Sequence, residues 1–268
     1  MDSQQLHLFV LAVVQGITEF LPVSSDGHIL IVNALWERAS GRTLDDPLGV
    51  EIILHAGTLL AILVMYWRRL LRLLSDDRHM IGRIVVGTLP AVAVGLPLHE
   101  IEALRSWLES PLLAGCLLPV TGLILLLGGR REGTIDYSQI SYRQAFLIGL
   151  AQATAPLPGI SRSGVTIITA LALGLRREAA ATFSFVLAVP AVSGAVVLGA
   201  KDLVFGSRNS VDLGPLLLAA ALSFVVGLAA LALLLRWLRQ GRLRPMGWWC
   251  IAVGAAFTAW QLLGRPGP

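Results

Sequence analysis

One apolar run, Leu6–Leu35, is broken midway by the stretch Gln15-Gly-Ile-Thr-Glu-Phe-Leu-Pro-Val-Ser-Ser-Asp-Gly-His28. A second run, Gln144–Leu175, is broken in the same way by Gln152-Ala-Thr-Ala-Pro-Leu-Pro-Gly-Ile-Ser-Arg-Ser-Gly-Val165. Aligned without a gap, Gln15 falls on Gln152, Ser24 on Ser161 and Gly27 on Gly164. The two breaks therefore indicate an internal repeat.

The composition around these breaks is typical of a membrane protein. The chain has 268 residues, of which 55% are hydrophobic and 14% charged, whereas soluble domains carry about 25% charged residues. Six uninterrupted apolar runs approach the roughly 20 helical residues that a hydrocarbon core requires. They are Val50–Trp67, Ile81–Leu98, Pro111–Leu127, Phe183–Ala200, Gly214–Leu235 and Met246–Leu263. We predict an all-α polytopic membrane protein with six spanning helices.

The charges of the loops predict the orientation of these spans. Basic residues cluster after the first, third and fifth runs, whereas the loop His99–Ser110 carries three glutamates and one arginine. The positive-inside rule places the basic loops in the cytoplasm and His99–Ser110, Lys201–Leu213 and both termini outside. The net charge of +4 follows from this pattern, so we expect no nucleic-acid partner. No basic segment precedes the first apolar run, so we expect no cleaved signal peptide.

The two broken runs are each followed by three spans, so the halves 1–130 and 131–268 must cross the membrane in opposite directions. Paired interrupted segments in inverted halves predict a binding site near the bilayer midplane. Irregular backbone at that depth requires a surrounding of protein or water. We therefore expect two re-entrant helix hairpins whose tips meet, in an inverted-topology repeat. Two kinked ordinary spans are the alternative.

The second break has the features of a phosphate site. Pro158 ends one half-helix, and Ser161 is placed to cap the next, whose free N–H groups and positive dipole end attract anions. Arg162 adds a fork of donors that matches phosphate oxygens. Gly159, Ser161, Ser163 and Thr166 are the further candidate phosphate-binding residues, with Ser24 from the first break. The alternative is an Arg162 side chain that extends to the lipid headgroups.

The first break carries the ionisable candidates. Glu19, Ser25, Asp26 and His28 lie within one short stretch, and a carboxylate buried there must pair, bind a metal or take up a proton. The alternative is a structural pair of Glu19 with His28 or Arg162. Gln15 shares a helix face with Glu19. Glu51 and His55, also four residues apart, either support the site from outside or set the tilt of their span or cap it.

These two breaks resemble the undecaprenyl-diphosphatase family, also known as bacitracin-resistance proteins. The family pattern joins (Glu/Gln)-x-x-x-Glu to Phe-Leu-Pro-Val-Ser-Ser-x-Gly-His, and later has Pro-Gly-x-Ser-Arg-Ser-x-x-Thr. Here the first part stands as Gln15…Glu19-Phe20 to His28 and the second as Pro158 to Thr166. The similarity continues through Val50–Arg69 and Phe183–Pro190, and the order of segments looks the same along nearly all of the chain.

The resemblance implies removal of one phosphate from undecaprenyl diphosphate, which recycles the lipid carrier of cell-wall (peptidoglycan) synthesis and gives bacitracin resistance. It also implies a multi-pass protein of the bacterial cytoplasmic membrane whose site opens to the outer, periplasmic side. By motif position, functional roles fall on Glu19, Ser25, His28, Ser161, Arg162 and Thr166. A divalent cation, Mg²⁺ or Ca²⁺, is implied, with Glu19 as the candidate ligand. Gln15 stands where the double-glutamate form of the motif has a second carboxylate, which weakens a model with two clamping carboxylates.

The expected chemistry combines the resemblance with the residues. Arg162 and the two half-helix N-termini would hold the diphosphate, with Ser25 as nucleophile or binding hydroxyl and His28 as general base or acid. Covalent and direct-water routes both stay open. The expected partners are the isoprenoid diphosphate substrate and membrane lipids, and a homodimer is left open. The alternative function is a transporter or flippase of lipid phosphate or another anion that uses the same re-entrant site. A binding scaffold for lipid headgroups is a third reading.

Overall fold

The computed structural model describes residues 3–129, 131–205 and 213–263, and within these ranges every regular element is a helix. The elements in chain order are α1 (Ser3–Phe20), α2 (Ser25–Ser40), α3 (Pro47–Arg72), α4 (His79–Glu100), α5 (Glu102–Leu108), α6 (Pro111–Gly128), the 3₁₀ turn η1 (Tyr137–Gln139), α7 (Tyr142–Gln152), α8 (Arg162–Ala172), α9 (Arg177–Phe205), α10 (Leu213–Arg239) and α11 (Arg244–Leu263). The predicted all-α class is confirmed.

Six of the described helices, α3, α4, α6, α9, α10 and α11, are long and apolar enough to cross a membrane. Each contains one of the six apolar runs, so the predicted spans are confirmed. Several extend beyond the apolar residues; α3, for example, continues past Trp67 to Arg72. Basic side chains favour this extension because they interact well with the negative C-terminal end of the helix dipole.

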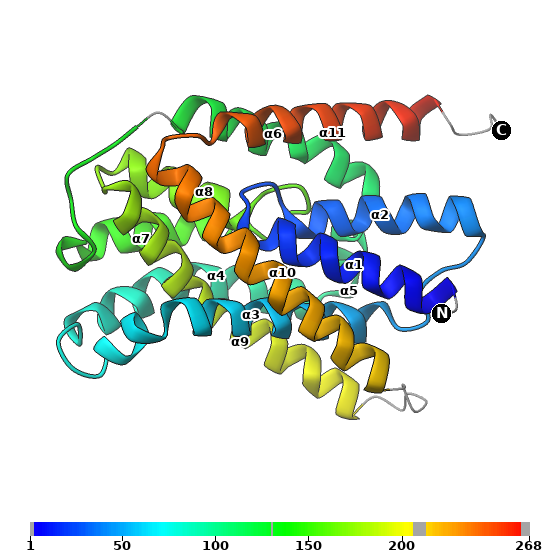
Figure 1. Cartoon of the computed structure of the whole chain (residues 1–268), viewed down its shortest axis with the longest axis horizontal. Helices are drawn as coiled ribbons and strands as arrows, with labels where there is room; N and C mark the ends of the chain where they lie inside the picture. The colour runs from blue at the N-terminus through cyan, green and yellow to red at the C-terminus, as the bar shows by residue number, and fades with distance from the viewer. Residues whose placement is uncertain (1–2, 130, 206–212, 264–268) are drawn as a thin grey trace.

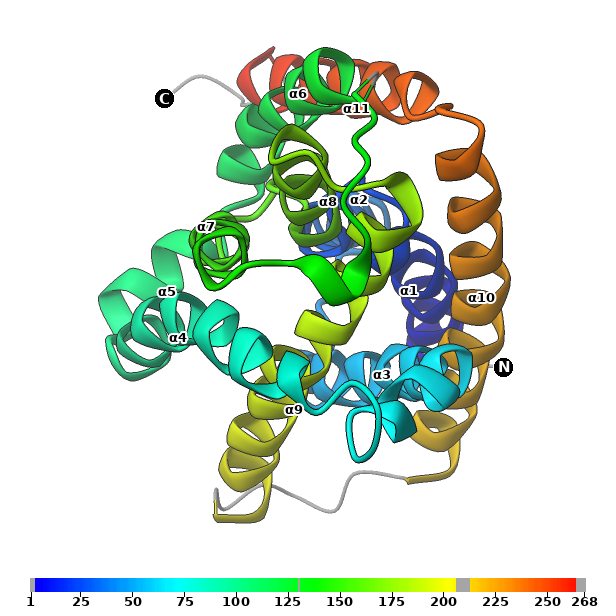
Figure 2. The same cartoon turned by 90° about the vertical axis from the view of Figure 1, so that its left-hand side faces the viewer.

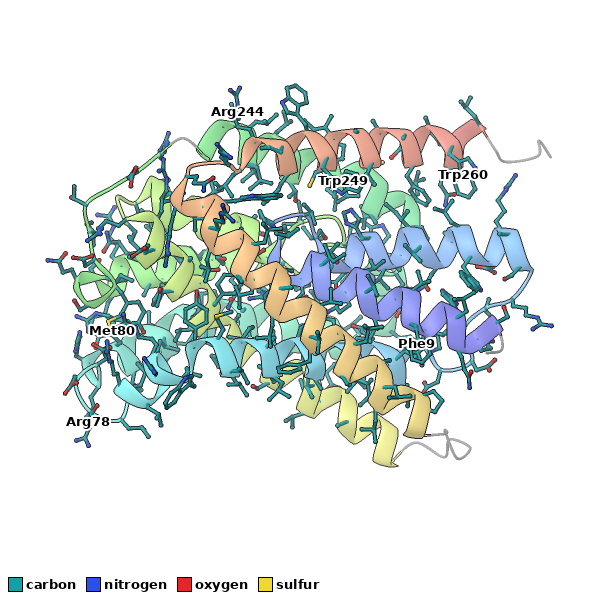
Figure 3. All side chains as sticks on the ribbon, in the orientation of Figure 1. Phe9, Arg78, Met80, Arg244, Trp249 and Trp260 are labelled. Carbon is teal, nitrogen blue, oxygen red and sulfur yellow. The ribbon has the colours of Figure 1, made fainter. Side chains whose placement is uncertain are left out.

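The three basic loops lie at one end of the bundle, where α3, α6 and α10 end (Figure 1). Figure 3 places Arg78 and Arg244 at this end and Phe9 and Trp260 toward the other. This grouping meets the requirement of the positive-inside rule. Arg130, which the sequence assigns to one basic loop, and residues 206–212 of the predicted outer loop lie outside the described residues.

The two broken runs form helix pairs, α1 with α2 and α7 with α8, which approach the centre of the bundle from opposite ends (Figure 1). In Figure 2, α1, α2 and α8 lie inside a ring of the longer helices. Their burial lets irregular backbone exist at this depth, since lipid cannot satisfy its polar groups. The re-entrant course in a bilayer and the repeat halves 1–130 and 131–268 stay predictions.

Local sequence accounts for the first break and for the start of α8, but the prediction that Pro158 ends the preceding half-helix is wrong, because α7 ends at Gln152. α1 ends at Phe20, two residues before Pro22, and Ser24 then caps α2 by accepting a hydrogen bond from the amide of Gly27. In the second pair, Ser161 caps α8 by accepting from the amide of Gly164, as predicted. The capping serines satisfy N–H groups that have no partner within their own helices.

The tips of the two helix pairs touch through glycines and one serine. The Gly159 amide donates to Ser24 Oγ at 3.1 Å, and a Cβ on Gly27 would lie 3.0 Å from the Gly159 backbone. Thr121 of α6 fixes the second tip, because its hydroxyl donates to the Gly159 carbonyl at 2.6 Å and accepts from the Ser161 amide at 3.0 Å. The meeting of the tips is therefore built from backbone contacts that larger side chains would obstruct.

Gly159→Ala should destabilise the fold strongly, because its φ is +94° and the new Cβ would lie 2.6 Å from the Ala114 carbonyl oxygen. Gly41→Ala is the matched control, since its φ is +65° but nothing lies within 4 Å of its Cβ. We expect a cost of about 1 kcal/mol at Gly41 from backbone strain, and an added ~1–3 kcal/mol at Gly159 from overpacking. Thermal unfolding in detergent measures both, and equal midpoints would contradict the close packing of the second tip against α6.

Candidate active site

Glu19 is the centre of a hydrogen-bonded cluster that joins the two tips. Its Oε1 accepts from Arg162 Nη2 at 2.5 Å, and its Oε2 accepts from Ser25 Oγ at 2.8 Å. Gln15 Nε2 also donates to Oε2, at 3.2 Å. The side chains of Glu19 and Arg162 are 6% and 13% exposed. The carboxylate therefore carries a charged partner and two neutral donors in a largely buried position.

Three helix ends bring this cluster together. Glu19 lies in the last turn of α1, while Ser25 and Arg162 are the first residues of α2 and α8. The cluster borders a cavity of about 240 Å³, whose lining also includes residues of α3, α4, α7 and α9. Both α2 and α8 point their N-terminal ends at this region, where unpaired N–H groups and the positive end of each helix dipole favour an anion.

The sequence allowed two alternatives in which Glu19 and Arg162 have no catalytic role. The alternative in which the Arg162 side chain extends to the lipid headgroups is wrong, because its guanidinium binds Glu19 near the tips. The pairing of Glu19 with Arg162 is present, and Glu19 has no contact with His28 among the described interactions. The pair still leaves capacity for a ligand, since Arg162 Nη1 is buried without a hydrogen-bond partner in the described residues.

His28, the expected general base or acid, does not line the cavity that this cluster borders. Its Nδ1 lies 2.8 Å from the Ser24 carbonyl oxygen, and its Nε2 accepts from Trp249 Nε1 at 3.0 Å. Its ring also stacks on that of Trp249, which Figure 3 labels on α11. Both nitrogens are thus engaged, and His28 holds the Ser24 backbone in its unusual conformation with φ 71°.

The histidine at the cavity is His55 of α3. Its Nε2 lies 3.8 Å from Glu19 Oε2 and 3.9 Å from Asp26 Oδ1, and its Nδ1 lies 3.0 Å from the Glu51 carbonyl oxygen. The sequence left open whether His55 supports the site or only sets the tilt of its span or caps it, and the structure places it at the cavity wall. Glu51 stands one helical turn before it and is exposed, outside the cavity lining.

The candidate phosphate-binding residues divide into two groups. Ser24, Ser161 and Arg162 line the cavity. Ser163 and Thr166 do not: Thr166 Oγ1 lies 2.6 Å from Ser184 Oγ of α9, and Ser163 Oγ lies 3.2 Å from Ser161 Oγ. Their role in binding phosphate stays a prediction, since Thr166 here joins α8 to α9 and Ser163 contacts the residue that caps its own helix.

The Gly159 amide, also predicted to bind phosphate, is directed elsewhere. It donates to Ser24 Oγ, so it holds the two tips together instead of facing the cavity. Its neighbour Ile160 lines the cavity, but Gly159 does not.

Several residues in this region carried little signal in the sequence. Thr121 and Trp249 lie in apolar runs far from both motifs, and only the fold brings them to the tips. Gln152 lines the cavity, is 2% exposed, and has no hydrogen-bond partner for either side-chain polar atom in the described residues. Its alignment with Gln15 was the available signal.

Within the described part of the chain, no group of three His, Cys, Asp or Glu side chains is arranged to hold a metal ion by itself. Glu19 is already occupied by Arg162 and Ser25. The carboxylate of Asp26 is more accessible than that of Glu19, because it borders the cavity and is 48% exposed. The donors fit a cation that arrives with phosphate oxygens, which is the usual mode for Mg²⁺, and do not fit one held by protein alone.

The fold and the cluster together define a polytopic membrane protein with a buried charged cluster at the junction of two broken helices. Residues 8–256 match the model of the family described as Bacitracin resistance protein BacA. The chain therefore belongs to this family, as the resemblance of its two motifs predicted.

Curated relatives extend the match over nearly the whole chain. A protein of Rhodopirellula baltica named Undecaprenyl-diphosphatase is 46% identical over 256 residues, which cover 94% of this chain and 96% of the relative. Relatives of the same name from Methanothrix thermoacetophila and Nocardioides sp. are 38% and 39% identical. They cover 93% and 94% of this chain, and in each case 94% of the relative.

Proposed function

We propose that this chain hydrolyses undecaprenyl diphosphate to undecaprenyl phosphate and inorganic phosphate. This activity returns the lipid carrier to peptidoglycan synthesis and gives resistance to bacitracin. Membership of the BacA family and the name of the relatives support it. The observation that carries it is the cluster of Ser25, Glu19 and Arg162 at the cavity, because it combines a nucleophile, a proton acceptor and a phosphate-binding cation.

In the proposed reaction Ser25 Oγ attacks the terminal phosphorus of the diphosphate. The bond between this phosphorus and the bridging oxygen breaks, and undecaprenyl phosphate leaves with the electron pair. Glu19 is placed to accept the hydroxyl proton, because Ser25 Oγ donates to its Oε2 at 2.8 Å. Water then attacks the phosphoserine, releases phosphate and regenerates Ser25. A hydroxyl activated by an adjacent base is the usual form of a protein nucleophile.

The fixed donors at the tips supply the electrostatic part of catalysis. The N-termini of α2 and α8 would hold the terminal phosphoryl group, and Arg162 would bind the diphosphate beside it. Preorganised donors of this kind stabilise the charge that develops on transferred phosphoryl oxygens. His55, beside Glu19 and Asp26, is the group we assign to proton transfer with water in the second step. It thereby takes the role that the sequence alone assigned to His28.

We also propose that a divalent cation, Mg²⁺ or Ca²⁺, accompanies the diphosphate. Asp26 would hold it together with phosphate oxygens, and the Glu19 carboxylate would lie close by. The bound ion would neutralise part of the negative charge of the diphosphate.

The cavity supports a site that opens to the periplasm. Its lining includes His55 in the first part of α3, Gly95 in the second half of α4, and Ala195 in α9. These positions lie toward the ends of the helices that are remote from the basic loops, and the positive-inside rule assigns that side to the periplasm. Small residues of α4 and α9 leave room for the isoprenoid tail to pass into the lipid.

Transport remains the rival function, since paired broken helices in inverted halves are also a transporter architecture. The Ser25–Glu19 hydrogen bond favours chemistry, because a transport site needs no nucleophile held against a base. Phosphate release by purified protein in detergent separates the two, since detergent abolishes directional transport.

Ser25→Ala should abolish phosphate release from undecaprenyl diphosphate in detergent, because it removes the attacking oxygen. Wild-type protein quenched in acid during turnover should carry phosphoserine at Ser25, detectable by mass spectrometry. Ser40→Ala, at the exposed far end of the same helix, is the matched control and should keep full activity. Substantial turnover by Ser25→Ala without phosphoenzyme would show that water attacks directly. Absence of phosphate release from wild-type protein would overturn the proposed function.

Two histidine variants separate positioning from proton transfer. His28→Asn retains a donor near the Ser24 carbonyl, so turnover should fall by about tenfold or less, the loss of one hydrogen bond, with an unchanged pH profile. His55→Gln should lower kcat by about 10²–10⁴-fold and remove one limb of the pH profile, because general acid–base catalysis contributes this much. The reverse ranking would return the catalytic role to His28.

A further inference from the structure

Gln152 is a buried amide that the fold leaves without a partner at the cavity wall. It is the last residue of α7 and is 2% exposed, yet neither its Oε1 nor its Nε2 has a hydrogen-bond partner in the described part of the chain. Leaving a buried polar group unpaired destabilises the fold. Such a residue therefore indicates a ligand that supplies the missing partner.

The internal repeat explains why this amide is unpaired. Gln15 stands at the matching position of the first half and donates to the carboxylate of Glu19, four residues later. Four residues after Gln152 the chain has Pro156, which carries no carboxylate. The second half thus keeps the donor and lacks its acceptor. An anion in the cavity can occupy the place that the carboxylate takes in the first half.

The guanidinium of Arg162 also has a buried donor without a hydrogen-bond partner. Arg162 gives its Nη2 to Glu19, while its Nη1 is buried without a partner in the described residues. Arg162 and Gln152 line one cavity. Because Glu19 neutralises the charge of Arg162, added affinity for an anion must come from further donors such as a neutral amide.

We propose that Gln152 binds phosphate oxygens together with Nη1 of Arg162, at the phosphoryl group that Ser25 does not attack. This inference rests on the proposed function and adds a second phosphate position to the site. Since a diphosphate fills both positions and a monophosphate only one, Gln152 is the residue that makes the site prefer the diphosphate substrate over its monophosphate product.

The test measures binding apart from turnover. Inorganic diphosphate and orthophosphate are titrated against purified protein in detergent, with thermal stabilisation as the readout. Wild-type protein should bind diphosphate more tightly. Gln152→Met keeps the length of the side chain and removes both polar atoms, so diphosphate affinity should fall by roughly tenfold to hundredfold, the value of a hydrogen bond to a charged group, while orthophosphate affinity changes little.

Two further variants complete the experiment. Gln152→Glu places a carboxylate where phosphate would bind, so it should weaken diphosphate binding more than Gln152→Met. Gln261→Met, near the end of α11 and outside the cavity lining, is the control and should bind as wild type. In turnover assays Gln152→Met should raise KM for the lipid diphosphate with a smaller change in kcat.

Unchanged discrimination between diphosphate and orthophosphate in both Gln152 variants would overturn the inference. If wild-type protein released no phosphate from the lipid but the binding difference still depended on Gln152, the proposed function would fail while the second phosphate position would stand.

Discussion

The ion pair between Arg162 and Glu19 is the contact on which the rest of this structure depends. It joins residues 143 positions apart in sequence, one from each helix break, in a bundle whose depth makes an isolated charge very costly. The backbone contacts at Ser24 and Gly159 bring the tips close enough for the pair to form. Folding of the two halves against each other and assembly of the site are therefore one event.

The pair also sets the chemistry of the cavity. Because Glu19 pairs with the guanidinium of Arg162 and accepts the Ser25 hydrogen bond, a single carboxylate holds the cation and, in the proposed reaction, activates the hydroxyl. In the proposed complex the anion would contact the remaining side of Arg162, the starts of two helices and neutral donors. A site with little net positive charge can release a charged product more readily than a site lined by several arginines. Its fixed donors stabilise charge by their position.

The sequence predicted the spans, the breaks and the Ser161 cap, because hydrophobic length, proline and capping residues act locally. It did not predict the direction of His28. The rotation of α2 about its axis is set by packing with Trp249, 221 residues away. Ser163 and Thr166 belong to a motif typical of phosphate binding, but their hydroxyls lie near those of Ser161 and Ser184. His55 was visible as a polar residue in an apolar span, yet only the tertiary fold places it beside Glu19.

A double-mutant cycle on Glu19→Gln and Arg162→Gln tests the central claim most directly. Each single variant leaves one buried charge unpaired, so each should lower stability in detergent by about 3–5 kcal/mol. The double variant removes both charges and should recover much of that loss while remaining inactive in phosphate release. If the two losses simply add in the double variant, the residues do not interact, and the account of how the tips meet and form the site is contradicted.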